Sequence, residues 1–152
     1  MIEPLEQRIA PAAIVTYTDI DGDLVKITAS KGPLNLGDLT FLGGGSAGQL
    51  AKLDLTDAGF DGASIVFSVT KMGGGDGLAK VGYLKADGVD LDRVIVQGDL
   101  AKIVVGDADH RDVAPKLLSA TTMGRNASTT GAPDQLCEIR GKLGALKVAE
   151  VV

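Results

Sequence analysis

Hydrophobic and polar positions alternate in a short phrase that recurs along most of the chain. The phrase reads small, any residue, Leu, small, Lys, aliphatic, any residue, apolar, as in GDLAKIVV from Gly98. In that copy Ile103 and Val105 are two apart, the period of a strand, whereas Leu100 and Ile103 are three apart, so a bend must separate them. The anchor leucines are Leu24, Leu50, Leu78, Leu100 and Leu143, at intervals of about 26, 28, 22 and 43 residues. Such recurrence is typical of repeat architectures, in which each unit packs against the next.

A second phrase repeats between copies of the first. The segment AGFDGASIVF from Ala58 matches DGVDLDRVIV from Asp87. The corresponding pairs are Gly59 with Gly88, Asp61 with Asp90, Ile65 with Val94, and Phe67 with Val96. Whole units therefore repeat, and each is predicted to contain strand, Gly/Asp turn, strand and Gly/Asp turn. The alternating, β-branched segment IVTYT from Ile14 predicts a further strand.

These patterns predict a single all-β domain over residues 14–152, with residues 1–13 as an N-terminal motif that caps it. The favoured fold is a parallel β-helix (a β-solenoid) of about five or six coils, with glycines at the corners. A β-sandwich is the alternative, because it also combines short strands with Gly-rich turns. It would not normally repeat the same apolar phrase at the same place in each unit.

Composition changes this picture in a few respects. The chain is 45% hydrophobic but only 3% aromatic, so Leu, Ile, Val and Ala must form the core. A net charge of -5 argues against a nucleic-acid partner, because phosphate contacts need a basic surface. No apolar run is long enough to span a membrane. The single cysteine, Cys137, excludes an internal disulfide and is interpreted as a small core residue.

The segment DIDGD is the candidate metal site. Asp19, Asp21 and Asp23 alternate, and three carboxylates at this spacing can converge on one Ca²⁺ if the backbone turns around it. The segment is not an EF-hand, since Leu24 and Ser30 stand where that loop requires Gly and Glu. The alternative is an Asp-rich turn whose side chains accept hydrogen bonds from local amides.

Four lysines occupy the same position of the phrase and form the candidate ligand-binding feature. In a parallel solenoid they would stack about 4.8 Å apart into a ladder, which could bind an anionic polysaccharide. The alternative is a solvated edge that contributes solubility. The lysines are Lys26, Lys52, Lys80 and Lys102.

Two other motifs are interpreted structurally. The segment GGGSAG, from Gly43 to Gly48, fits a dinucleotide-binding template, but a strand phrase follows it where a helix is required, so it is interpreted as a corner. His110, the only histidine, has no second His or Cys partner and is interpreted as a loop residue. No catalytic residue and no cofactor other than Ca²⁺ is assigned.

The N-terminal segment IEPLEQRIAPA resembles the short "LEPR-type" motif that opens exported β-strand-repeat proteins of planctomycetes and verrucomicrobia. The segment YTDIDGDLVKITASKG from Tyr17 is similar to the repeats of those proteins. The resemblance implies a secreted or cell-surface protein with right-handed parallel β-helical repeats and no assigned activity. Residues 1–13 contain no apolar stretch of the kind found in a standard signal peptide.

The expected role is therefore structural or adhesin-like, and not enzymatic. One alternative is a polysaccharide-processing β-helix enzyme of the lyase or glycosidase type, which needs paired carboxylates or a base beside Ca²⁺. Another is a calcium-stabilised module of a larger assembly. The closing segment LKVAEVV is an apolar strand phrase without a polar cap. It predicts a fragment of a longer repeat protein, or self-association through an open C-terminal coil.

Overall fold

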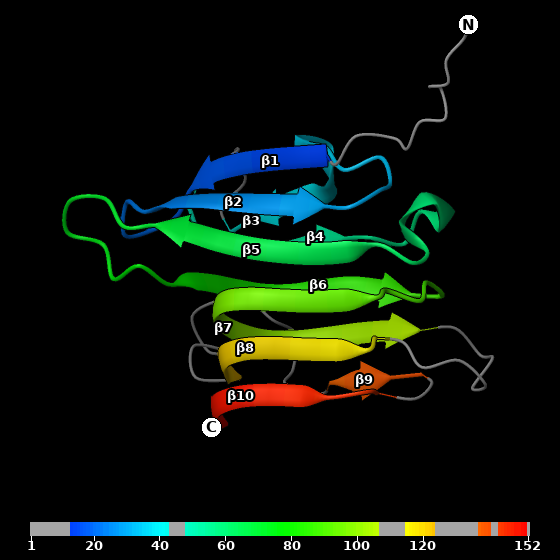
Figure 1. Ribbon diagram of the computed structural model, residues 1–152. Helices are drawn as coiled ribbons and strands as arrows, with labels where there is room; N and C mark the ends of the chain where they lie inside the picture. Colours follow the sequence, from blue (N-terminus) through cyan, green and yellow to red (C-terminus); the bar gives the residue numbers. More distant parts are fainter. Residues whose placement is uncertain (1–12, 43–47, 107–114, 124–136, 141–142, 152) are drawn as a thin grey trace, which may run out of the picture.

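The computed structural model describes residues 13–42, 48–106, 115–123, 137–140 and 143–151. These residues form one ten-stranded mixed sheet that curls into a half-barrel (Figure 1). Two short 3-10 helices, η2 (Leu36–Asp38) and η3 (Ala58–Phe60), lie between strands. The strands are β1 (Ala13–Thr18), β2 (Leu24–Ala29), β3 (Leu39–Phe41), β4 (Leu50–Asp54), β5 (Ser64–Thr70), β6 (Ala79–Asp87), β7 (Arg93–Gly106), β8 (Leu117–Met123), β9 (Glu138–Ile139) and β10 (Leu146–Val151).

The first two strands form an antiparallel hairpin in which buried and exposed positions alternate. Val15 and Tyr17 of β1 and Val25 and Ile27 of β2 point into the core, and the residues between them face outward. Strand β2 pairs on its other side with β5, again antiparallel. The predicted strand at IVTYT is therefore present, and it forms one edge of the sheet.

Strand β7 joins the antiparallel strands β1, β2 and β5 to the parallel strands β6 and β8, because it pairs with four other strands. Along one edge it pairs with β5 and then β6, and along the other with β8 and then β9, all in parallel. The change of partner falls near Gly98, whose φ is +151°. A Cβ at Gly98 would lie 2.0 Å from the Ala79 carbonyl oxygen, so β6 approaches β7 at a distance that only glycine permits.

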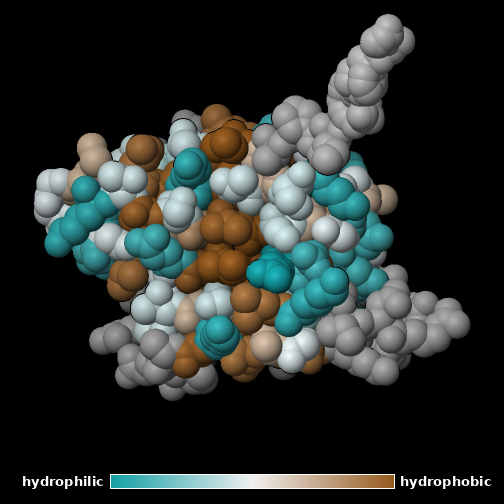
Figure 2. Space-filling model, viewed as in Figure 1, coloured by the Kyte–Doolittle hydropathy of each residue, from teal (hydrophilic) through white to brown (hydrophobic). Residues whose placement is uncertain are grey.

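The core is a single aliphatic cluster, as the composition predicted. Leu50, Leu53, Leu84, Leu100 and Ile103 are completely buried in it. The aromatic contribution is small, and among the described residues Tyr17 and Phe41 form a ring pair, edge to face, at a centroid distance of 5.1 Å. On the face seen in Figure 2, hydrophobic side chains lie over the middle of the strands and hydrophilic ones toward their ends.

The predicted right-handed parallel β-helix is wrong. Strands β1, β2 and β5 pair antiparallel, as do β3 and β4, and one curled mixed sheet replaces a stack of equivalent coils, so the fold is closer to a sandwich or barrel. The physical reason is that an alternating apolar pattern fixes which face of a strand is buried but not its direction. Direction is set by the turns, and the DIDGD turn reverses the chain as a hairpin.

The second phrase pairs as its sequence indicates. Ile65 lies beside Val94 and Phe67 beside Val96 in the parallel pair of β5 and β7. Copies of the first phrase do not align in this way, because Val81, three residues beyond Leu78, pairs with both Leu50 and Leu100. Similarity between phrases therefore predicted register correctly in one case and missed it by three residues in the other.

Helices in the described part of the chain are short. None of them is long and apolar enough to cross a membrane.

Candidate functional site

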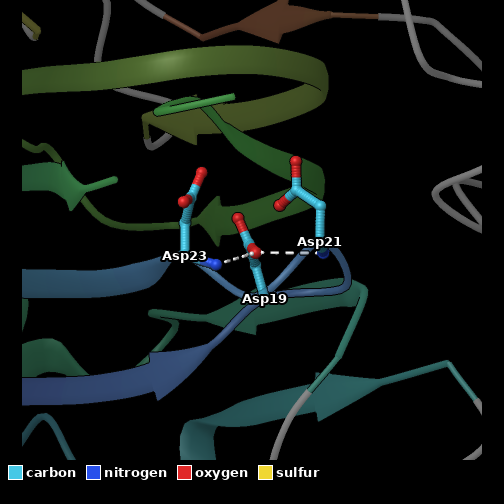
Figure 3. A group of neighbouring side chains, drawn as sticks. All are labelled: Asp19, Asp21 and Asp23. Carbon is cyan, nitrogen blue, oxygen red and sulfur yellow. Dashed lines mark hydrogen bonds between the residues drawn. The ribbon is translucent and has the colours of Figure 1, made fainter. Parts of the chain in front are cut away.

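The Asp-rich turn between β1 and β2 is shaped by Asp19 (Figure 3). Its Oδ1 accepts hydrogen bonds from the backbone N–H groups of Asp21, at 3.2 Å, and Asp23, at 2.9 Å. The Asp19 N–H donates to the Asp23 carbonyl at 2.9 Å, and Gly22 adopts the positive φ, +95°, that the turn requires. Only 8% of Asp19 is exposed. The predicted alternative, side chains bonded to local amides, is thus present in the turn.

Asp23 attaches this hairpin to a segment distant in the sequence. Its side chain is completely buried, and its two oxygens accept from the N–H groups of Met72, at 2.8 Å, and Gly77, at 2.6 Å. A Cβ at Gly75 would lie 1.8 Å from Asp23 Oδ1, so residues 71–77 pass against the carboxylate itself. Asp23 together with residues 71–77 is called the carboxylate clamp below.

Asp21 completes the cluster but is less well satisfied. One of its oxygens accepts from the Asp76 N–H at 3.3 Å. The other, Oδ1, is buried and has no hydrogen-bond partner among the described residues. The three carboxyl groups offer oxygen atoms that all lie within 4.8 Å of one another. A buried acceptor in such a cluster needs a proton or a cation nearby.

Asp19 and Asp21 differ in how readily they ionise. Burial raises the pKa of the Asp19 carboxyl to about 7, and the neighbouring Asp21 carboxylate raises it as well, while the bond from the Asp23 amide opposes the shift. The neighbouring Asp19 carboxyl group lowers the pKa of Asp21. Asp19 therefore keeps its proton to a higher pH than an ordinary carboxyl group, whereas Asp21 loses its proton at a lower pH. Burial, with the Asp19 charge, also raises the pKa of Tyr17, whose buried hydroxyl has no partner among the described residues.

The donor set is suited to a hard cation. Ca²⁺ binds carboxylate and carbonyl oxygens in flexible geometries, and three converging carboxyl groups are a common start for such a site. The residues present fit that ion, because a cation would supply the partner that Asp21 Oδ1 lacks and would replace the proton on Asp19. Asp19, Asp21 and Asp23 would be its ligands.

The four aligned lysines do not form one row. Lys26 lies on β2 beside Thr16 and Ser68, in the antiparallel part of the sheet. Lys80 pairs with Asp99 in the ladder of β6 and β7. Lys102 pairs with Tyr83, and its ammonium lies 5.0 Å from the centre of that ring. Lys52 is on β4, where it pairs with Thr40. The pattern in the sequence therefore does not become a ladder in space.

Other residues singled out by the sequence have mixed outcomes. Cys137 is exposed, so its interpretation as a core residue is wrong: it precedes the two-residue strand β9 and does not lie within a longer one. His110 and residues 43–47 of GGGSAG lie outside the described residues. The role of residues 73–77, GGGDG, was missed, and the available signal was three consecutive glycines beside an Asp, a sequence that allows backbone to approach a charged group closely.

Comparison with known proteins does not add to this description. No protein-family model matches the chain, and no curated protein or solved structure matches it significantly. The function has to be inferred from the residues themselves.

Proposed function

We propose that this chain is a non-enzymatic structural module, adhesin-like, of an exported bacterial protein. The observation that carries the proposal is the carboxylate clamp. Asp23 is completely buried, and both of its oxygens accept backbone N–H groups of residues 71–77 instead of facing a cavity. The Asp23 carboxylate therefore stabilises the fold. The resemblance of IEPLEQRIAPA to an export-associated motif supports the surface location.

The test is an assay for turnover combined with cell fractionation. Purified protein is incubated with a panel of neutral and uronic polysaccharides, and reducing ends and unsaturated products are measured. We expect no turnover and recovery of the protein in the cell-envelope or secreted fraction. Polymer cleavage above a buffer blank would contradict the structural role, and recovery only in the cytoplasmic fraction would contradict the location.

Calcium stabilisation of the module is a second proposed function, favoured by the orphan oxygen of Asp21. With Ca²⁺ bound, the three carboxylates would neutralise its charge while Asp23 retained its amide bonds to the clamp. The cation would then strengthen the connection between the β1–β2 hairpin and residues 71–77. Mg²⁺ should bind less well, because it demands a stricter octahedral geometry and dehydrates reluctantly.

Isothermal titration with CaCl₂ and melting curves with and without chelator test this second proposal. We expect saturable heat and a higher Tm with Ca²⁺ than with chelator. Asp21→Asn should remove the Ca²⁺ response and leave the Asp23 clamp in place. Asp57→Asn, at an exposed cap outside the cluster, is the matched control and should respond as the unaltered protein does. Absence of heat together with an unchanged Tm would exclude the site.

We further propose that copies of the chain associate through the edge of β10. Among the described strands β10 pairs only with β8, so its other edge presents backbone groups that can accept a further strand. Leu146, at the start of β10, is 53% exposed. Sedimentation velocity should show concentration-dependent association that Leu146→Lys reduces and Leu36→Lys, on the exposed helix η2, does not. A single monomeric species at every concentration would contradict it.

A further inference from the structure

One outer face of the sheet is crossed by a continuous row of paired residues, which we call the cross-strand band. Neighbours in such a row project from the same side of a sheet. The row crosses β1, β2, β5, β7, β8 and β10, so at about 4.8 Å per strand it is about 24 Å long. Its members, in that order, are Ile14, Thr28, Val66, Ile95, Ser119 and Lys147.

The cross-strand band is accessible and combines apolar side chains with hydroxyl groups. Ile14 is 57% exposed, and Val66 and Ile95 are half-buried because their outer surfaces face away from the core. Figure 2 shows hydrophobic side chains over the middle of the strands on this face. Further hydroxyl groups lie in the adjacent rows, on Thr16, Ser64 and Ser68. The face therefore offers apolar contact beside groups that both donate and accept hydrogen bonds.

The charges on this face are positive, although the whole chain carries a net charge of -5. Lys26 and Arg93 flank the band on opposite sides, since their rows lie two positions beyond Val66 and two positions before Ile95 on parallel strands. Lys147 ends the band, and none of the three cations has an ion pair among the described residues. The described outward positions of β1, β2, β5 and β8 contain no Asp or Glu.

The acid that directly precedes Arg93 does not cancel this charge. The Asp92 carboxylate lies 3.5 Å from the Lys116 ammonium and accepts a hydrogen bond of 3.3 Å from the Ser64 hydroxyl. Asp92 is thus compensated by another cation at the rim of the face. The Arg93 guanidinium, on an exposed residue, is left to attract an anionic partner.

We propose that this face binds an acidic polysaccharide whose charge is carried by uronic acid residues. The sugar rings would lie along the cross-strand band, with their carbon–hydrogen faces against Val66 and Ile95. Their hydroxyls would exchange hydrogen bonds with Thr28 and Ser119, and their carboxylates would be attracted to the flanking cations. The inference rests on the adhesin-like role proposed above and names the class of ligand for that role.

Other anionic partners fit this face less well. A nucleic acid carries closely spaced phosphates and needs a dense basic surface, whereas Lys26, Arg93 and Lys147 are spread over the full width of the face. A densely sulfated polymer is disfavoured for the same reason. An anionic membrane would need large apolar side chains that enter its interface, and the band carries short hydroxyl and β-branched side chains instead. A uronic acid polymer combines sparser charge with many hydroxyls.

The test is isothermal titration of the full-length protein with an oligomer of galacturonic acid, and separately with its methyl ester, which keeps the sugar rings and loses the charge. Chelator is present throughout, so that Ca²⁺ at the Asp cluster does not contribute. We expect saturable heat with the acid, weaker binding as NaCl is raised, and about tenfold weaker binding of the ester. Ile95→Glu should weaken binding of the acid by about tenfold or more, whereas Ile95→Lys, equally disruptive to packing, should retain it.

The matched comparison uses two double variants with the same change of net charge. Lys26→Gln with Arg93→Gln should weaken binding about tenfold, whereas Lys52→Gln with Lys85→Gln, on β4 and β6 outside this face, should not. The inference is overturned if the acid gives no heat, if its ester binds as tightly, or if both double variants behave alike. Tighter binding of dextran sulfate, oligothymidylate or phosphatidylserine vesicles would also overturn it. Absence of binding leaves the structural role intact, whereas cleavage of the oligomer would contradict that role itself.

Discussion

The antiparallel part of the sheet, β1, β2 and β5, differs from the parallel part, β6, β7 and β8, in what determines its geometry. In the antiparallel part, hydrogen bonds of two side chains determine the geometry: Asp19 closes the hairpin turn, and Asp23 attaches the hairpin to residues 71–77. In the parallel part, the close approach of two backbones determines the geometry: β6 meets β7 at Gly98, where no side chain fits. The same amphipathic phrase occurs in both parts, so the connecting residues, and not the strands, select strand direction.

The largest expected effect comes from comparing one glycine from each part. Gly98→Ala places a Cβ 2.0 Å from the Ala79 carbonyl and strains a backbone at φ +151°, so we expect a loss of about 3–5 kcal/mol of unfolding free energy. Gly22→Ala meets nothing within 4 Å and costs only the strain of its positive φ, about 1–2 kcal/mol. Chemical denaturation measures both. Equal losses of unfolding free energy would mean that the close approach of β6 and β7 does not determine the geometry of the parallel part.

The carboxylate clamp should be the most sensitive point of the antiparallel part. Asp23→Ala leaves the buried N–H groups of Met72 and Gly77 without acceptors, which should lower the unfolding free energy by about 2–4 kcal/mol. Asp57→Ala, at the exposed cap of η3, should cost about 1 kcal/mol or less. Denaturant titration of the two variants side by side gives the difference. If both variants lost the same unfolding free energy, the carboxylate clamp would stabilise the protein no more than an exposed helix cap does.

Stability should also depend on pH through Asp19. The folded protein keeps this proton up to about pH 7, whereas an unfolded chain releases it near the ordinary value of 3.8. The folded state thus binds more protons between pH 4 and 7, so stability falls as pH rises through this window, by at most about 1.4 kcal/mol per pH unit for one proton. Asp21, whose pKa is lowered, contributes in the opposite sense at lower pH.

Asp19→Asn keeps an oxygen for the turn amides and removes the titration. Its stability should therefore vary less between pH 4 and 7 than that of the unaltered protein, as measured by urea denaturation at several pH values. Asp57→Asn should retain the slope of the unaltered protein. Parallel curves for the protein and Asp19→Asn would contradict the raised pKa of Asp19.

The smallest loss of stability is expected where a side chain, and not the backbone, forms the hydrogen bonds between the two parts of the sheet. Gln97 accepts from the Val69 N–H at 3.2 Å and donates to the Gly77 carbonyl at 3.0 Å, so it joins β5 to the segment before β6. Because Gln97 is exposed, Gln97→Ala should cost only about 0.5–1 kcal/mol. Thermal unfolding measured by circular dichroism is sufficient, and a loss above that of Asp23→Ala would reverse the proposed ranking.

Strand identity and core composition could be predicted from the sequence, whereas strand direction could not. The alternation at Val15 and Tyr17 and the pairing of Ile65 with Val94 follow from local patterns. Direction depended on whether DIDGD turned the chain as a corner or as a hairpin, and one glycine and one Asp side chain decided that. The spacing of Asp19, Asp21 and Asp23 identified the cluster. Its dependence on Gly75 and Asp76 involves contacts between residues some fifty positions apart, such as Asp23 and Met72, which no local pattern reports.

Strand β7 has a consequence for the order in which the protein forms. Its partners on one edge, β5 and β6, precede it in the chain, and those on the other, β8 and β9, follow it. During synthesis the β1–β2 hairpin can form early from local contacts, but the two parts of the sheet cannot be joined until Gly106 has left the ribosome. Because β7 has partners on both edges, its amides should exchange with solvent deuterium more slowly than those of the other described strands.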